Sequence, residues 1–523
     1  MAFDYIIVGS GSAGGVLAAR LTEDPHTSVL LLEAGPLDDD EMIAVPAGFS
    51  TLFKTRWDWN YETSSQKHLQ DRRAHWPRFK GLGGCTSMNA MIYIRANRAD
   101  YDEWRDGFGA TGWGFDDVLP YFIRSENNQR LRDEWHGTEG PLLVEDRRFT
   151  HDLTHAFVES AVAHGLKRND DFNGVEQEGA GLYQVTQNRG RRWSVADAYL
   201  RPAMERPNLT VRTESLVHRV LFEGTRAIGV EYSHRGRMHV EHAGAEIILS
   251  GGAINSPQLL MLSGVGPGAH LRDHGIDVVV DSPSVGQNLQ DHPAAGTIVR
   301  TQGTTDLAEA VTVGNLLRWK ATRTGPLVSN VGEGGAFYAS RDDLALPDIQ
   351  IHVAPVAFYD NGMHEPLERS VTIAPTLVNV QSRGEIRLRS ADPRWHPHID
   401  PKYFDDAADL DAMVAGYRRM LDIVWQGPLE KMLKAPWIPA SRTPSDDDII
   451  DAIGGLAQTL YHPTSTCAMG TGEGSVVDPE LRVHGAQGLR VVDASVMPRV
   501  PRGNTNAPTI MIGEKAADLI RGA

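Results

Sequence analysis

DYIIVGSGSAGGVLAARLTEDPHTSVLLLEAG, residues 4–35, is the stretch of the chain that decides its fold. Asp4–Val8 is apolar and predicts a strand, and Gly15–Leu21 predicts the opening of a helix. A second apolar run, Ser28–Leu32, predicts a strand that ends beside Glu33. Strand, turn, helix and strand in this order indicate a βαβ unit in a parallel sheet.

Three glycines form the turn of this unit in the spacing Gly9-x-Gly11-x-x-Gly14. Gly9 permits the sharp turn, Gly11 lets a pyrophosphate approach the main chain, and Gly14 lets helix and strand pack closely. The helix N-terminus offers free N–H groups and a partial positive charge. Glu33 follows Gly14 by 19 residues and can accept hydrogen bonds from a ribose. The stretch predicts a dinucleotide site and leaves FAD and NAD both open.

Composition excludes several classes of protein. The 523 residues carry a formal net charge of −17, so no nucleic-acid partner is expected. No apolar run reaches the ~18 residues of a membrane span, and no basic leader precedes the first strand. We therefore expect a cytoplasmic protein without a membrane span. The two cysteines and the spacing of the 20 histidines predict neither a disulfide framework nor a metal site.

Rossmann-type signals recur at both ends of the chain. Leu209–Val217 predicts a strand, and Gly251–Leu262 predicts a glycine turn followed by a helix. Leu489–Val492 predicts a late strand and Pro508–Ile520 a helix with proline in its first turn. The stretch between about 296 and 450 is richer in β-type patterns. The predicted fold class is α/β: a Rossmann-type domain built from discontinuous segments, plus an α+β substrate-binding domain with an antiparallel sheet.

Six ordered motifs together resemble the glucose–methanol–choline (GMC) flavoprotein oxidoreductases. Besides the N-terminal unit they are PRFKGLGGCTSMN (77–89), GAINSPQLLMLSGVG (252–266), VGQNLQDH (285–292), YHP (461–463), and DAS (493–495) leading to NTNAPT (504–509). The resemblance covers essentially the whole chain and implies FAD as the cofactor. It also implies a mainly FAD-binding part at 1–295 with a flavin-covering lid at about 40–75. Residues 296–455 would be mainly substrate-binding, and 456–523 would return to the FAD domain with the catalytic residues.

The resemblance also implies which residues hold FAD. The ADP half would lie on Gly9, Ser10, Gly11, Ser12, Gly14, Glu33 and Ala34, with Val217 facing the adenine. The remaining implied contacts, to the pyrophosphate, ribityl chain and flavin, are Gly83, Gly84, Thr86, Asn89, Ala90, Met91, Ala253, Asp493, Ala494, Asn504, Thr505 and Asn506. In choline oxidase a histidine just before the matching asparagine is bonded covalently to the flavin. Here that residue is Met88, so non-covalent FAD is expected.

Catalysis in this family oxidises an alcohol, and it needs a base that is neutral near pH 7, which suits imidazole. His462 matches the catalytic histidine, and the resemblance assigns Asn506 as its partner, which would orient the alcohol oxygen. The expected partners are a small alcohol and either O₂ or another electron acceptor. The sequence does not determine the oligomeric state.

Aromatic residues bear on the choice of alcohol. Trp57 and Trp59 lie in the expected lid and Tyr461 beside the base, so they are candidate substrate contacts. Such rings could cage a quaternary ammonium, as choline dehydrogenase-like activity requires, or simply pack the lid. No acidic residue can be placed opposite a trimethylammonium group, so the expected substrate is an aryl or small hydrophobic primary alcohol.

Three other functions fit parts of the pattern. A hydroxynitrile lyase would keep its flavin oxidised when substrate is added without oxygen. A flavin photoenzyme acting on fatty acids would need a long apolar tunnel and light. A dehydrogenase that uses only NAD would purify colourless, whereas the flavoprotein expected here is yellow.

Overall fold

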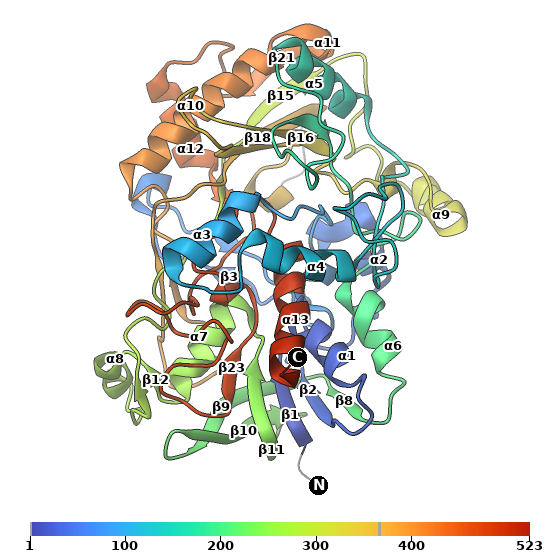
Figure 1. Cartoon of the computed structure of the whole chain (residues 1–523). Helices are drawn as coiled ribbons and strands as arrows, with labels where there is room; N and C mark the ends of the chain where they lie inside the picture. The colour runs from blue at the N-terminus through green and yellow to red at the C-terminus, as the bar shows by residue number, and fades with distance from the viewer. Residues whose placement is uncertain (1–2, 364–367, 523) are drawn as a thin grey trace.

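Two sheets organise the molecule in the computed structural model, which describes residues 3–363 and 368–522 (Figure 1). The first sheet has the order β8-β2-β1-β11-β10-β9, with β23 paired to β11. Its strands are β1 (Phe3–Val8), β2 (Val29–Leu32), β8 (Leu209–Arg212), β9 (Ser215–Glu223), β10 (Arg226–His234), β11 (Arg237–Leu249) and β23 (Leu489–Val491). The pairs β8-β2, β2-β1, β1-β11 and β11-β23 are parallel, as expected for a sheet of βαβ units.

The second sheet is antiparallel at every pair and has the order β21-β15-β18-β17-β16-β7, with β14 and β22 at its side. Its strands are β7 (Gly179–Leu182), β14 (Pro293–Ala294), β15 (Thr297–Thr301), β16 (Gly334–Tyr338), β17 (Ile349–Ala354), β18 (Ser370–Leu377), β21 (Leu433–Ile438) and β22 (Gln458–Thr459). The α/β class with a separate antiparallel sheet is thereby confirmed. The domain boundaries stay a prediction, and β7, β14 and β22 join this sheet from outside residues 296–455.

Helices and short strands fill the remaining space. The α-helices are α1 (Gly14–Leu21), α2 (Glu41–Ala44), α3 (Arg98–Phe108), α4 (Phe115–Ser125), α5 (Asp152–Ala163), α6 (Arg201–Ala203), α7 (Gly252–Leu262), α8 (Gly268–Asp273), α9 (Val313–Thr322), α10 (Ala407–Val424), α11 (Gly427–Glu430), α12 (Asp446–Leu456) and α13 (Asn506–Arg521). Short helical turns of 3-10 or π type are η1 (Pro46–Leu52), η2 (Lys67–Leu69), η3 (Gly84–Ser87), η4 (Ala196–Leu200), η5 (Pro326–Val328), η6 (Asp360–Gly362) and η7 (Ala494–Val496). Paired short strands are β3 (Tyr61–Glu62) with β4 (His75–Trp76), β5 (Glu126–Asn128) with β6 (Leu142–Val144), β12 (Val265–Gly266) with β13 (Val280–Asp281), and β19 (Glu385–Arg387) with β20 (His398–Asp400).

The last helix belongs to the first sheet. α13 runs beside α1 and β1 in Figure 1, and a Cβ on Gly513 would lie 3.0 Å from the Ala13 Cα. Glu514 on α13 is fully buried and accepts hydrogen bonds from Arg20 (2.9 Å), Arg124 (2.8 Å) and the Tyr199 hydroxyl (2.7 Å). This network ties the C-terminal helix to elements from the first 200 residues.

One predicted element differs. Leu209–Val217 is predicted as a single strand, but β8 ends at Arg212 and β9 begins at Ser215. The two strands lie at opposite ends of the strand order of the first sheet. Glu214 between them has φ +53°, a left-handed backbone that breaks the strand. No helix among the described residues combines the length and apolar character needed to cross a membrane.

Candidate active site

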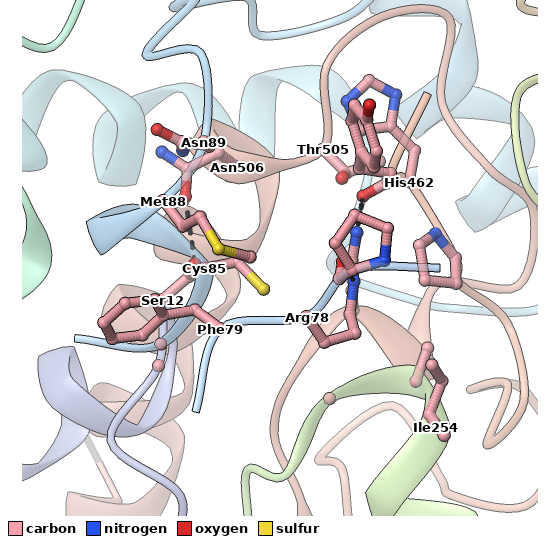
Figure 2. Close-up of a pocket in the computed structure, with 18 of the residues that line it drawn as sticks. Ser12, Arg78, Phe79, Cys85, Met88, Asn89, Ile254, His462, Thr505 and Asn506 are labelled. Atoms are coloured by element: carbon pink, nitrogen blue, oxygen red, sulfur yellow. Dashed lines mark hydrogen bonds between the residues drawn. The ribbon is translucent and has the colours of Figure 1, made fainter. Parts of the chain in front are cut away.

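One cavity of about 350 Å³ brings the predicted cofactor and catalytic residues together. Its wall draws on the β1–α1 turn, η3, the start of α7, the 460–463 segment and the start of α13 (Figure 2). The predicted residues that line it are Gly9, Ser10, Gly11, Ser12, Glu33, Ala34, Trp59, Gly84, Asn89, Ala90, Met91, Val217, Ala253, Tyr461, His462, Asp493, Ala494, Asn504, Thr505 and Asn506.

At one end the wall is main chain held together by glycines. A Cβ on Gly84 would lie 2.6 Å from the Gly11 Cα, so these two backbones touch. A Cβ on Gly11, by contrast, would meet nothing closer than the Gly84 Cα at 3.8 Å. Gly11 therefore keeps an open approach to the backbone on the cavity side. This is the shape that a pyrophosphate at the N-terminus of α1 requires.

Glu33 closes this end at the tip of β2. It is buried and accepts hydrogen bonds from the Ser10 N–H (3.1 Å), the Ser10 hydroxyl (2.6 Å) and the Gly35 N–H (2.9 Å). Burial raises the pKa of this carboxyl above its usual range. A buried carboxylate beside an open glycine backbone fits the ribose and pyrophosphate of a dinucleotide.

Four predicted residues lie outside the wall. Gly14 packs α1 on the turn, because a Cβ there would lie 2.0 Å from the Gly9 carbonyl oxygen. Gly83 has φ +87°, and the Thr86 hydroxyl donates to the Gly83 carbonyl at 2.6 Å, so both shape the η3 turn. Trp57 stacks on Phe79 with ring centroids 5.6 Å apart and is 2% exposed, so it packs the lid rather than facing the cavity.

The other end of the cavity is built around His462. Its main-chain N–H donates to the buried Asp291 carboxylate at 2.8 Å, and the Tyr403 hydroxyl donates to the same carboxylate. The preceding residue, Tyr461, has φ +68°. Its carbonyl oxygen accepts from the Arg78 guanidinium, and its hydroxyl donates to Asn361 at 2.6 Å. These contacts hold an unfavourable backbone conformation and fix where the imidazole lies.

The hydrogen bonds around His462 determine which ring nitrogen is free. The Gln350 amide donates to the Asn504 oxygen at 3.1 Å, so the Asn504 NH₂ group faces His462 Nε2 at 3.3 Å. With the Asn504 amide in this orientation, Nε2 is the acceptor and the proton is assigned to Nδ1, which then donates to His292 Nδ1 at 3.0 Å. His462 thus presents an unprotonated Nε2 at the cavity wall.

Burial keeps this imidazole neutral. It lowers the pKa of His462 well below its ordinary value, and the neighbouring His292, His352 and Arg78 lower it further. Burial also lowers the pKa of His292 to about 3 and that of His352 to about 3. Neither His292 Nε2 nor His352 Nε2 has a hydrogen-bond partner within the described part of the chain. The site is a cluster of three neutral histidines.

Asn506 does not reach this cluster. Its side-chain oxygen accepts from the Ser12 hydroxyl at 3.0 Å, and Figure 2 shows it beside Asn89, away from His462. The contact expected for Asn506 is made instead by Asn504, two residues earlier and before α13 begins. Residues 504 and 506 share one motif, so only the tertiary structure distinguishes them.

Sequence reasoning also missed His292 and His352. His292 ends the VGQNLQDH motif, which was noted without a role for the histidine, whereas nothing around His352 in the sequence singles it out. His352 lies on β17, and His292 directly precedes β14, so the second sheet brings both toward His462.

The wall near His462 is apolar. Phe49, Phe53, Met88 and Phe358 line it together with Tyr461, and the Phe53 and Tyr461 rings lie 5.9 Å apart. Apart from His352 and His462, the acidic and basic side chains among the described residues that line the cavity are Glu33, Arg78 and Asp493. Asp493 is buried, and the Gly252 N–H (2.8 Å) and the Ser256 hydroxyl (2.5 Å) donate to it.

Trp59 lines the cavity, but one face of its ring is covered. The Lys80 ammonium lies 4.5 Å from the ring centroid, and the ring stacks with Tyr61 at 5.9 Å. Because a cation already occupies Trp59 and Trp57 is packed on Phe79, the two tryptophans do not form a cage for a second cation.

Comparison with known proteins agrees with this architecture. Residues 3–294 and 380–513 match the N-terminal and C-terminal models described as GMC oxidoreductase. The chain is 43% identical to alcohol dehydrogenase (acceptor) of Pseudomonas putida, over 99% of this chain and 95% of that protein. It is 41% identical to mitochondrial choline dehydrogenase of Homo sapiens, over 99% and 90% of the two chains. The solved structure of pyridoxine 4-oxidase from Mesorbium loti superposes with a TM-score of 0.92 at 30% identity, covering 100% of this chain and 99% of that one.

Proposed function

The chain belongs to the GMC oxidoreductase family, whose members typically use FAD and act on alcohols, and we propose that it binds FAD non-covalently and oxidises a neutral, apolar primary alcohol to the aldehyde. The observation that carries this proposal is the unprotonated Nε2 of a neutral His462 at an apolar cavity wall. Primary aryl and alkyl alcohols fit that wall because they bring no charge into it.

The cofactor would lie along the glycine end of the cavity. Gly11 and the α1 N-terminus would hold the pyrophosphate, and Glu33 the adenosine ribose. Met88 is 4% exposed and packs among apolar side chains, and its thioether has no proton to lose, so it cannot form the neutral bond to the ring that a histidine forms. FAD should therefore pass into the supernatant when the yellow protein is precipitated with acid. Flavin that stays with the pellet would contradict the non-covalent assignment.

His462 would remove the hydroxyl proton of the alcohol at Nε2. The Asn504 NH₂ group, which points at the same nitrogen, would donate to the alcohol oxygen and stabilise the charge that develops on it. His292, bonded to Nδ1, keeps the proton on the far side of the ring so that Nε2 is available. Bound FAD would supply the acceptor for the hydride that leaves the α-carbon.

The charge of the wall sets the substrate class. The wall near His462 offers a quaternary ammonium the rings of Phe49, Phe53, Phe358 and Tyr461 but no free carboxylate, because Glu33 and Asp493 are engaged with N–H and hydroxyl donors. Arg78 is the charged side chain that faces the base, and its sign repels a cation. Choline is therefore disfavoured, although a choline dehydrogenase is among the relatives.

An anaerobic alcohol screen tests the proposal. We expect benzyl alcohol or a linear alkyl alcohol to bleach the flavin absorbance faster than choline at equal concentration. Admitting air and assaying peroxide afterwards separates an oxidase from a dehydrogenase. Faster bleaching by choline would overturn the substrate class. A flavin that stays oxidised while a cyanohydrin is cleaved would replace the redox function by that of a hydroxynitrile lyase.

A further inference from the structure

Apolar side chains gather on the outer face of α9, which stands out at the right-hand edge of the molecule in Figure 1. Val311, Val313 and Leu317 are 76%, 76% and 61% exposed. Val313 and Leu317 are four residues apart, so they share one stripe of the helix, and the exposed Ala321 continues it. None of these side chains is buried, so they do not contribute to the core. Polar residues at the same positions would allow the chain to fold equally well, and an exposed apolar face therefore indicates a contact with a partner.

The inner face of the same helix is anchored. Trp319 is 1% exposed, its ring N–H donates to the Gly190 carbonyl at 2.9 Å, and it packs with Val45, Leu327 and Val328. The contacts of Trp319 fix the orientation of α9, so Val313 and Leu317 on its opposite face point toward solvent.

Basic side chains surround this apolar stripe. Arg318, Lys320 and Arg323 lie on or directly after α9, and the sequence holds no acidic residue between Glu309 and Glu333. Exposed Arg148 donates to the carbonyl oxygens of Thr322 and Arg323 and adds a fourth cation. Of these four, only Lys320 forms a salt bridge within the described residues, with Glu41 at 2.8 Å. Residues 310–332 therefore carry only positive charge, with Glu41 of α2 beside them, on a chain whose net charge is −17.

We propose that this face, the α9 apolar stripe with its basic rim, docks on an anionic lipid surface. Exposed aliphatic side chains can enter the headgroup region, and the cations around them are attracted to acidic lipids. The acidic remainder of the molecule is repelled by the same surface, so only this face approaches it. A second copy of the chain would have to place this basic rim against an equally basic rim, which disfavours a symmetric dimer through α9.

The location of the stripe connects it to the cavity. Met42, at the edge of the expected lid, packs both against the cluster that holds Trp319 and against the cluster of Phe49, Phe53 and Met88 that lines the cavity. A docked α9 would therefore place the lid next to the bilayer. This proposal does not depend on the identity of the alcohol, and lipid binding is measured without turnover.

Co-sedimentation of the FAD-loaded protein with vesicles tests the proposal. We expect binding to vesicles of phosphatidylcholine mixed with phosphatidylglycerol, at least about tenfold weaker binding to phosphatidylcholine alone, and weakening by salt. The triple variant Val311→Ser/Val313→Ser/Leu317→Ser should lose about tenfold or more in partition coefficient. Arg318→Gln/Arg323→Gln should also bind more weakly, while both variants keep wild-type rates on a water-soluble alcohol.

The matched control is Val175→Ser/Met238→Ser/Val240→Ser, because these residues are 76%, 52% and 49% exposed elsewhere on the surface. This variant should bind vesicles as the wild type does. Wild-type protein that stays in the supernatant would overturn the proposal, as would equal losses in the two triple variants. Self-association in sedimentation velocity that the α9 triple variant abolishes would overturn it in favour of a second copy.

Discussion

The two ends of the cavity are built in different ways. At the Glu33 end, Gly9, Gly11 and Gly84 present main chain, and most of it, from Gly9 to Glu33, comes from one stretch of the sequence that Gly84 joins from further along the chain. At the His462 end, side chains form the wall. The hydrogen bond between His292 and His462 joins residues 170 positions apart. A main-chain site depends on where a Cβ is missing, whereas a side-chain site depends on how the whole chain packs. The first should respond to added volume and the second to lost functional groups.

The largest expected effects separate packing from binding at the glycine end. Gly14→Ala would place a Cβ 2.0 Å from the Gly9 carbonyl oxygen and 2.9 Å from the Ser250 Cβ. We expect it to cost about 3 kcal/mol or more of stability, measured by chemical denaturation.

Gly11→Ala meets nothing closer than 3.8 Å, so it should fold normally while FAD affinity falls by about 10- to 100-fold, measured by flavin titration. Equal flavin affinity in Gly11→Ala and wild type would remove Gly11 from the cofactor site.

His462→Ala should affect only the other end. Removing the base is expected to slow alcohol-dependent flavin bleaching by about 10² to 10⁴-fold, while the bound-flavin spectrum and the melting temperature stay close to wild type. Stopped-flow absorbance without oxygen measures the rate. A variant that bleaches at more than a third of the wild-type rate would show that another group takes the proton.

Asn504 and Asn506 provide a matched pair two residues apart. Asn504→Ala removes the amide that faces His462 Nε2 and should lower kcat/KM by about 10²-fold. Asn506→Ala loses only the hydrogen bond from Ser12 and should lower it by less than about tenfold. The reverse order would restore Asn506 as the partner of the base.

Asn504→Asp adds a test by pH. A carboxylate at this position favours the protonated form of His462, so it should move the acid limb of the kcat/KM profile to higher pH.

The pH dependence of the wild type tests the histidine cluster itself. Because burial lowers the pKa of His462, kcat/KM should stay level as pH falls through 6.5 and decline only below it.

The free energy of unfolding should be largest above about pH 6.5 and decrease as pH falls toward about 3. In this range His292 and His352 bind protons in the unfolded chain but stay neutral in the folded protein. Denaturation at several pH values measures this slope, and His352→Leu should reduce it. A slope unchanged in that variant would place the titration elsewhere.

Sequence reasoning predicted the glycine end well for a physical reason. The turn, the helix start and Glu33 all depend on local backbone geometry, so their spacing is visible in one stretch. The fold class followed from the same local signals. The spacing also predicted different roles for two of the glycines, and the structure agrees, since Gly11 faces the cavity and Gly14 packs the helix against the turn.

The His462 end could be predicted only in part. The candidate base, His462, was predicted from a motif, but His292 and His352 come together through pairing in the second sheet, which no local pattern encodes. The choice between Asn504 and Asn506 depended on where α13 begins. Trp57 was a candidate substrate contact because it lies in the expected lid, with packing of the lid as the alternative, and its stacking on Phe79 favours that alternative.

The late position of β23 and α13 has a consequence for biosynthesis. β23 completes the parallel sheet beside β11, and buried Glu514 ties α13 to α1 and α4. While a ribosome is still making residues 489–521, the glycine turn at the beginning of the chain lacks the helix that covers it. We therefore expect FAD to bind only after α13 has been made, and until then the side of α1 that α13 covers is exposed.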